Sequence, residues 1–359
     1  MKFLNKYMYK ISQINEIKGC PIAIYGVGRT AKYIYSYLKS EGHNIKFFVD
    51  NDPKKQYKKF LDLPIISKND MVNNNEIKGV ITAPRGLNIK SLELENLMHI
   101  PIITFDSYYV LKNINEHFNI YKYLLTDKAS KKTLKNILKA IVKDDDKYYS
   151  NINIRDQYFC IKRFMQVENK YYVDIGAYVG DSIERFIWMN PEFKKIYAFE
   201  PMKKQFKALN IRTHRLKEEW GLDEEQIVTE NSAIGEISEL IKIASSSNTV
   251  NFFITEDDIT INSNSYETIQ IISLDDYFYD KRIDLIKSDI EGFEMKMLNG
   301  AVNIIQNQLP KMAICTYHNI NDLLNIINFI NEIAPKKYKF ALRHHSNNFS
   351  ETVLYCWVE

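Results

Sequence analysis

Two short segments in the second half of the chain carry residues that could bind a nucleoside. Residues 171–181 read YYVDIGAYVGD, an apolar strand that leads through Asp174 into a turn containing Gly176 and Gly180. A second apolar strand ends at Glu200, in the sequence YAFEP. Glycines lack a Cβ atom and let a backbone turn tightly against a ligand, and an acid in the second position can accept the hydroxyls of a ribose. The pattern predicts half of a nucleotide-binding βαβ unit.

The spacing of these residues favours S-adenosylmethionine (SAM) over a dinucleotide. Dinucleotide sites normally carry G-x-G-x-x-G and place a pyrophosphate at the helix N-terminus. Here the glycines are further apart, and Asp181, followed by Ser182, would repel a phosphate at that helix entrance. Asp174 instead suits a ligand with an ammonium group, as in the methionyl part of SAM. A ligand-free packing turn with chance acids is the alternative.

A second cluster of ionisable residues follows a predicted buried strand in the segment 283–301, IDLIKSDIEGFEMKMLNGA. Its ionisable side chains near and after the strand end are Lys287, Asp289, Glu291 and Glu294. His318 follows the next strand and should emerge at the same sheet edge, where ligands of open α/β sheets bind. His318 or Asp289 could take a proton from a hydroxyl, and Mg²⁺ held by Asp289 and Glu291 is a competing route. Alternatively, the acids cap helices and His318 is a loop histidine.

Alternating apolar strands and amphipathic helices predict an α/β chain with two Rossmann-like domains. The expected divisions are a first domain at 1–112, a helical bridge at 113–170 and a second domain at 171–359. Strands are expected in the first domain at 21–25, 46–49, 79–81 and 100–104. Strands are expected in the second at 171–175, 195–199, 227–231, 283–289, 311–317, 337–344 and 352–359. The interval 235–273, rich in Ser, Asn and Thr, is expected to form strands or an insertion at the active site.

From about residue 158 to the end, the chain resembles the FkbM family of SAM-dependent methyltransferases. The matching pieces are VDIGAYVGDS, AFEP, ISLDDYF, IKSDIEGFEMKMLNGA, the histidine after the fifth strand and the closing LRHHS…ETVLYCWV. The resemblance implies a class I methyltransferase sheet and O-methylation of a sugar or polyketide hydroxyl. Tyr178 departs from it, because the family commonly has a small or polar residue there.

The resemblance also assigns roles to individual residues. Those that would hold SAM are Asp174, Gly176, Ala177, Gly180, Asp181, Ser182, Glu200, Pro201, Asn231, Ser232 and Ala233. Those expected to be catalytic are His318, Asp289 and Lys287. Those expected to contact the acceptor substrate are Glu291, Glu294, Arg343 and His344.

The first domain carries a weaker nucleotide-binding pattern. Gly26, Gly28 and Arg29 follow an apolar strand, and Asp50 ends the next strand in the sequence FVDND. The segment is similar to the nucleotide-sugar-binding domains of bacterial sugar-modifying acyltransferases, which implies that these four residues bind a nucleotide-linked sugar. A ligand-free structural domain and an NAD(P)-binding domain are the alternatives.

Composition limits the partners that we expect. The 359 residues contain 48 Lys and Arg against 45 Asp and Glu, a net charge of +3, which gives no signal for nucleic-acid binding. Four scattered cysteines suggest reduced thiols in a cytoplasmic protein. No window is apolar enough to span a membrane, and the first residues do not form a secretory signal.

Together these features predict a cytoplasmic SAM-dependent O-methyltransferase that acts on a sugar hydroxyl, as a free small molecule or linked to a nucleotide. A non-catalytic nucleotide-sugar-binding protein and an NAD-dependent sugar oxidoreductase are the alternative functions. Whether the protein is a homo-oligomer stays open.

Overall fold

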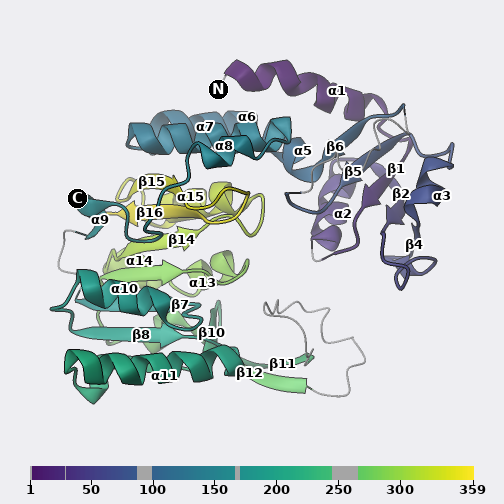
Figure 1. Ribbon diagram of the computed structural model, residues 1–359. Helices are drawn as coiled ribbons and strands as arrows, with labels where there is room; N and C mark the ends of the chain where they lie inside the picture. The colour runs from purple at the N-terminus through teal and green to yellow at the C-terminus, as the bar shows by residue number, and fades with distance from the viewer. Residues whose placement is uncertain (1, 29, 87–98, 166–169, 245–265) are drawn as a thin grey trace. The chain divides into compact units, whose positions relative to one another are not determined.

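The computed structural model describes residues 2–28, 30–86, 99–165, 170–244 and 266–359 (Figure 1). The chain divides into two compact units, and each is described by itself. Unit 1 consists of Met1–Lys122, Lys132–Ile152 and Asn347–Phe349, and unit 2 consists of Tyr123–Lys131, Asn153–Ser346 and Ser350–Glu359. The residues expected to form a helical bridge are therefore shared between the two units.

Unit 1 contains a six-stranded sheet with the strand order β3-β4-β2-β1-β5-β6. All neighbouring strands are parallel except the short pair β3 and β4. The strands are β1 (Pro21–Tyr25), β2 (Asn44–Val49), β3 (Lys59–Phe60), β4 (Leu63–Ile66), β5 (Gly79–Thr82) and β6 (Ile102–Thr104). The four predicted strands are present, and β3 and β4 were not predicted. Ile22, Ala23 and Ile24 of β1 are fully buried, as expected for a central parallel strand.

The chain before residue 151 also forms helices. They are η1 (Lys2–Tyr7), α1 (Met8–Glu16), α2 (Ala31–Ser40), α3 (Lys68–Val72), α5 (Phe105–Lys112), α6 (Ile114–Asn119), the π-helix η3 (Ile120–Leu124), α7 (Lys128–Lys143) and α8 (Lys147–Ser150). Ser67 starts α3 with a capping box, since its side chain accepts from the Asp70 N–H and Asp70 reaches back. Leu134 and Leu138, four residues apart on α7, are both buried and lie on one face of the helix.

Unit 2 contains a seven-stranded sheet with the order β15-β16-β14-β13-β7-β8-β9. The strands are β7 (Tyr171–Ile175), β8 (Lys195–Phe199), β9 (Ile227–Glu230), β13 (Leu285–Ser288), β14 (Lys311–Cys315), β15 (Lys339–His344) and β16 (Thr352–Trp357). The first five are parallel, and β16 inserts antiparallel between β14 and β15. The predicted α/β class with a Rossmann-like second sheet is confirmed.

A smaller sheet and eight helices complete the described part of unit 2. The small sheet has the order β10-β12-β11, formed by β10 (Ser232–Gly235), β11 (Glu239–Ala244) and β12 (Tyr266–Ser273). The helices are α9 (Lys162–Met165), α10 (Asp181–Met189), α11 (Lys203–Trp220), η4 (Glu224–Gln226), α12 (Leu274–Tyr277), α13 (Glu294–Asn299), α14 (Val302–Asn307) and α15 (Asp322–Ile333). The strands expected within 235–273 are β11 and β12, and the residues between them, 245–265, lie outside the described part.

Aromatic packing joins β7 to α10, the helix that follows it. Tyr172 of β7 stacks on Phe186 of α10 with ring centroids 4.2 Å apart, and both rings are fully buried.

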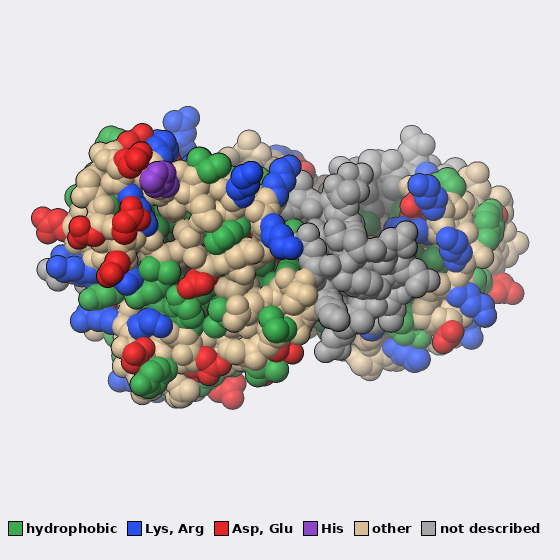
Figure 2. Space-filling model, turned by 90° about the horizontal axis from the view of Figure 1, so that it is seen from below, with side chains coloured by type: hydrophobic (Ala, Val, Ile, Leu, Met, Phe, Trp, Pro, Cys, Tyr) green, Lys and Arg blue, Asp and Glu red, His purple; other side chains and the backbone are tan. Residues whose placement is uncertain are grey.

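None of the described helices is long and apolar enough to cross a bilayer. On the face drawn in Figure 2, positive and negative side chains are interspersed, in keeping with the nearly neutral net charge.

Candidate active site

The turn after β7 needs glycine because it passes close to the end of β13. Gly176 has a φ of +72°, and a Cβ atom there would lie 2.0 Å from the carbonyl oxygen of Asp289. The backbone N–H of Gly176 donates to the carbonyl of Phe199, which ties the turn to β8. Gly180, with a φ of +82°, starts α10. The turn is therefore held against two strand ends by its backbone, with little room for side chains.

Glu200 fastens the same turn from the end of β8. One carboxylate oxygen accepts the N–H of Tyr178 at 3.0 Å, and the other accepts the N–H of Met202 at 2.9 Å. Burial raises the pKa of Glu200, and these two hydrogen bonds oppose the increase. The Asn231 amide donates to the Glu200 carbonyl at 2.9 Å. Glu200 is only 6% exposed, so its carboxylate is held in one orientation.

A cavity of about 440 Å³ lies at this sheet edge. The predicted site residues that line it are Gly176, Asp181, Ser182, Glu200, Pro201, Ser232, Ala233, Lys287, Asp289 and Glu291. The predicted residues of unit 2 that are outside the described lining are Asp174, Ala177, Gly180, Asn231, Glu294, His318, Arg343 and His344. The structure thus brings together side chains from the two sequence clusters, which are about a hundred residues apart.

Asp174, which we expected to contact a ligand ammonium, lies outside the described cavity lining. It is fully buried behind the turn, where the Lys287 ammonium lies 3.0 Å from one oxygen and the Ser182 hydroxyl donates to the other. Burial raises the pKa of Asp174, and Lys287 opposes this. The Lys287 ammonium also donates to the Gly176 carbonyl at 2.7 Å. Asp174 and Lys287 thus form a buried ion pair that supports the turn from beneath.

Asp289 lines the cavity and is held by two tyrosines. Tyr158 donates to one carboxylate oxygen at 2.8 Å, and Tyr317 donates to the other at 3.2 Å. Burial alone would raise the pKa of Asp289, but the positive charges of Lys287 and His318 lower it below its usual value. Asp289 is therefore ionised at neutral pH.

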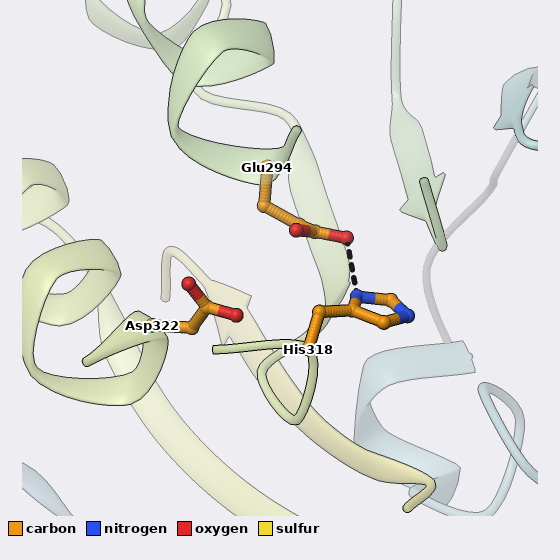
Figure 3. A group of neighbouring side chains, drawn as sticks. All are labelled: Glu294, His318 and Asp322. Carbon is orange, nitrogen blue, oxygen red and sulfur yellow. Dashed lines mark hydrogen bonds and ion pairs between the residues drawn. The ribbon is translucent and has the colours of Figure 1, made fainter. Parts of the chain in front are cut away.

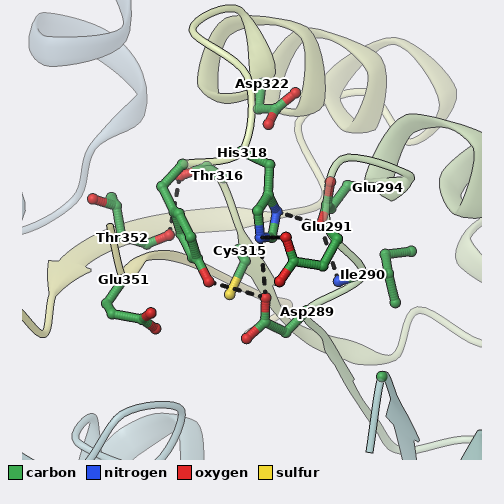
Figure 4. Close-up of polar contacts among 12 residues, drawn as sticks. Asp289, Ile290, Glu291, Glu294, Cys315, Thr316, His318, Asp322, Glu351 and Thr352 are labelled. Atoms are coloured by element: carbon green, nitrogen blue, oxygen red, sulfur yellow. Dashed lines mark hydrogen bonds and ion pairs between the residues drawn. The ribbon is translucent and has the colours of Figure 1, made fainter. Parts of the chain in front are cut away.

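His318 lies behind the cavity wall, between carboxylates. Its Nδ1 is 2.8 Å from Glu294 Oε1 (Figure 3), and its Nε2 is 3.4 Å from Asp289 and 3.7 Å from Glu291 (Figure 4). Burial lowers the pKa of His318, but the three acids outweigh it and raise the pKa to about 9. An imidazolium has no lone pair with which to accept a proton, so this geometry speaks against His318 as a general base at neutral pH.

The described residues contain one His, Asp and Glu group with spacing suited to a metal, formed by Glu294, His318 and Asp322. It does not include the predicted ligands Asp289 and Glu291. Within it, Nδ1 of His318 is already hydrogen bonded to Glu294, and burial raises the pKa of Asp322 to about 7. The structure gives the predicted Mg²⁺ no support.

Two predicted acceptor contacts are wrong in their location. Arg343 donates to the Ser130 hydroxyl at 2.7 Å and pairs with Asp127 at 3.2 Å, away from the described cavity lining. His344 is fully buried, and its Nδ1 contacts the Thr352 hydroxyl at 2.8 Å. Both belong to the β15–β16 pair, whose register fixes these side chains.

Sequence reasoning missed several residues of the cavity wall, namely Gln157, Tyr158, Gln205, Tyr317 and Glu351. Tyr317 could have been found, since it precedes His318 at the end of β14. Glu351 precedes β16, where Gln157 donates to it. Gln157 and Tyr158 lie in an irregular segment before β7, and no periodic pattern reveals where such a segment runs.

In unit 1, Asp50 makes contacts similar to those of Glu200. Its carboxylate accepts the N–H groups of Val27 and Asp52, both at 2.9 Å. Here, however, the Lys55 ammonium lies 3.1 Å from Asp50 and also donates to the Val27 carbonyl. A Cβ atom at Gly26 would meet Pro84 at 2.7 Å, so packing alone explains this glycine. Nucleotide-sugar binding at Gly26, Gly28 and Asp50 stays a prediction, and Arg29 lies outside the described residues.

The sheet order of unit 2, with a cavity at the carboxyl ends of β7, β8 and β13, is consistent with a Rossmann-like methyltransferase fold. Residues 174–340 match the family described as the methyltransferase FkbM domain. The match to an FkbM methyltransferase domain supports methyl transfer as the chemistry of unit 2.

The chain is similar to several solved structures. The chain is similar to methyltransferase FkbM from Methylobacillus flagellatus KT, with 20% identity over 97% of this chain and 93% of that one and a TM-score of 0.58. An rRNA methylase from Streptococcus thermophilus has 13% identity over 57% and 98% of the two chains, with a TM-score of 0.35. Aeropyrum pernix fibrillarin with bound S-adenosyl-L-methionine has 9% identity over 53% and 66%, with a TM-score of 0.32. No curated protein sequence matches the chain.

Proposed function

We propose that unit 2 is a SAM-dependent O-methyltransferase that acts on a hydroxyl group of a sugar. The observation that carries the proposal is that the Gly176 turn, the Glu200 carboxylate and the Asp289 carboxylate all line one cavity. The turn and Glu200 form a nucleoside site, and Asp289 adds an ionised base to the same space. Proximity of a donor site and a base is what methyl transfer to a hydroxyl requires.

The residues present fit SAM. The turn lines the cavity through Gly176 and Tyr178, and Gly176 offers only backbone there, since a Cβ atom would be 2.0 Å from the carbonyl oxygen of Asp289. Glu200 would accept the ribose hydroxyls with the lone pairs that Tyr178 and Met202 leave free. When bound, SAM supplies a methyl group activated by a sulfonium centre.

The task of this chain is to align the acceptor hydroxyl and to take its proton. We assign the proton to Asp289, because it lines the cavity and is ionised. Tyr158 and Tyr317 fix its orientation through their hydroxyl groups. A positioned general base typically contributes about 10²–10⁴-fold in rate. Lys287 and His318 act through Asp289, since their positive charges keep its carboxylate ionised.

The remaining cavity wall suits a polyhydroxylated acceptor. Gln157, Tyr317 and Glu351 offer amide, phenol and carboxylate groups. Glu291 adds another carboxylate, which lies with Asp289 near the Nε2 atom of His318 (Figure 4). Such a mixture of hydrogen-bond donors and acceptors can pair with several hydroxyl groups at once. The carboxylates disfavour an acceptor with a negative charge near the reacting oxygen.

Two measurements on the full-length protein test the proposal. Calorimetric titration with S-adenosylhomocysteine (SAH) should show saturable binding, and transfer of a tritiated methyl group to sugars or nucleotide sugars should be detectable. Asp289→Asn should bind SAH but lose most of the transfer. Absence of any binding of SAH by the wild-type protein would refute the assigned function.

A further inference from the structure

Part of the cavity lining is apolar and could contact a heterocyclic base. It begins beside Glu200, because Asn231 bonds to the Glu200 carbonyl and β10 follows directly. The side chains that form this part are Pro201, Met202, Ala233, Ile234 and Ile269. If Glu200 holds a ribose, the attached base must lie against this wall.

Two polar atoms interrupt the apolar wall. The Oε1 atom of Gln205 and the Oγ atom of Ser232 are both buried without a hydrogen-bond partner in the described structure, and both residues line the cavity. Ser232 is only 2% exposed. A buried polar group without a partner costs roughly 1–3 kcal/mol, so native structures rarely leave one unpaired. A ligand with a polar edge would satisfy both atoms.

The position of Gln205 allows it to approach such an edge. It lies in the first turn of α11, five residues after Glu200, so the same connection from β8 that positions the ribose anchor also positions the amide. Ser232 begins β10 on the next segment of the wall. A carboxamide oxygen accepts from an exocyclic amino group, and a serine hydroxyl donates to a ring nitrogen.

We propose that Gln205 recognises the 6-amino group of an adenine base, with Ser232 contacting a ring nitrogen. This inference rests on the proposed function, because it concerns the base of the same donor. It makes Gln205 a specificity-determining residue for 6-aminopurines over purines that lack the amino group. The acidic residues of the cavity, Asp181 and Glu200, disfavour a phosphate as the group that these atoms bind.

The test compares two ligands and three variants of the full-length protein by calorimetry. The ligands are SAH and its analogue with hydrogen in place of the 6-amino group. In the wild type, loss of the amino group should weaken binding about 5–10-fold, as expected for one hydrogen bond. Gln205→Met should bind SAH about 5–10-fold more weakly and should discriminate less than about 2-fold between the two ligands. Gln13→Met, at an exposed position of α1, is the matched control and should behave as wild type.

A second variant guards against misfolding of the first. Gln205→Glu keeps an acceptor oxygen and should keep the preference for SAH. The inference would be overturned if Gln205→Met kept the wild-type ratio of affinities for the two ligands, or if Gln205→Glu lost that ratio. In both cases, binding of SAH by the wild type would still uphold the proposed function. No binding of SAH by the wild type would overturn both.

Discussion

The imidazole Nδ1 of His318 lies 2.8 Å from the Oε1 atom of Glu294, and the side chains are 3% and 0% exposed. Glu294 Oε1 also accepts the N–H of Ile290, which fixes the carboxylate at the start of α13. On its other nitrogen the ring faces Asp289 and Glu291. His318, in the loop after β14, therefore contacts carboxylates from α13 and from the end of β13. It makes these contacts behind the cavity wall.

The first prediction concerns the protonation of His318. We expect NMR titration of the folded protein to give His318 a pKa near 9, well above its usual 6.5. Glu294→Gln should lower that pKa, because it removes the closest negative charge and leaves the amide at the same place. Glu291→Gln is the matched control and should lower it less, since Glu291 is 3.7 Å away and more exposed. Equal effects of the two variants would contradict the dominance of Glu294.

The second prediction follows from the sign of that shift. A histidine whose pKa is raised by folding stabilises the native state fully below its unfolded pKa of about 6.5. That contribution should be lost as the pH rises through about 9. The free energy of unfolding of the wild type relative to His318→Asn should therefore fall by about 1–3 kcal/mol between pH 6.5 and 9.5. Denaturant unfolding at a series of pH values measures this difference, and a constant difference would contradict it.

The third prediction uses two glycines with similar backbones and different surroundings. Gly176→Ala places a methyl group 2.0 Å from a carbonyl oxygen at a φ of +72°, so it should cost more than about 2 kcal/mol and abolish SAH binding. Gly221→Ala has a φ of +61° but no neighbour within 4 Å of the new Cβ atom. It should cost about 1 kcal/mol and leave SAH binding unchanged. Thermal unfolding and calorimetry measure the two effects.

The fourth prediction contrasts Glu200 with Asp50, each of which follows the second strand of its unit. Glu200→Gln should weaken SAH binding about 10-fold or more, since a charged acceptor contributes roughly 1.5–3 kcal/mol per hydrogen bond. Asp50→Asn should leave SAH binding unchanged. Because Lys55 pairs with Asp50, we also expect NADH to show no saturable binding to the full-length protein. Tight NADH binding that Asp50→Asn abolishes would instead support the dinucleotide alternative for unit 1.

Local patterns in the sequence were enough to predict most strands of the two larger sheets. The strand β7 starts and ends at the predicted residues, as do β1 and β8, because each is a short apolar run bounded by polar or turn residues. The strands β3 and β4 were missed, since β3 has only two residues and the burial pattern of β4 lacks a strict period of two. The π-helix η3 was missed as well, because nothing in IYKYL distinguishes it from an α-helix.

Site residues could be predicted only where a glycine or an acid lies at the end of a predicted strand. Gly176, Glu200 and Asp289 lie at strand ends, where topology alone brings them together. Whether a side chain faces the cavity depends on burial that the sequence does not encode locally. Asp174 and His318 illustrate this, because each lies one layer behind the wall and acts through a charged neighbour. Tyr158 comes from an irregular segment, which no rule of spacing could place.

The last prediction distinguishes Asp289, as the general base, from His318, as a charged neighbour that lowers the pKa of Asp289. If Asp289 takes the proton, Asp289→Asn should lower kcat about 10²–10⁴-fold at every pH while SAH still binds. His318→Ala should also leave SAH binding nearly intact, but its turnover should fall mainly at acidic pH. Without the imidazolium, the pKa of Asp289 should rise towards its usual value or above, so the acidic limb of the pH–rate profile should move to higher pH in His318→Ala. A profile that keeps its shape, with turnover unchanged, would remove His318 from the mechanism.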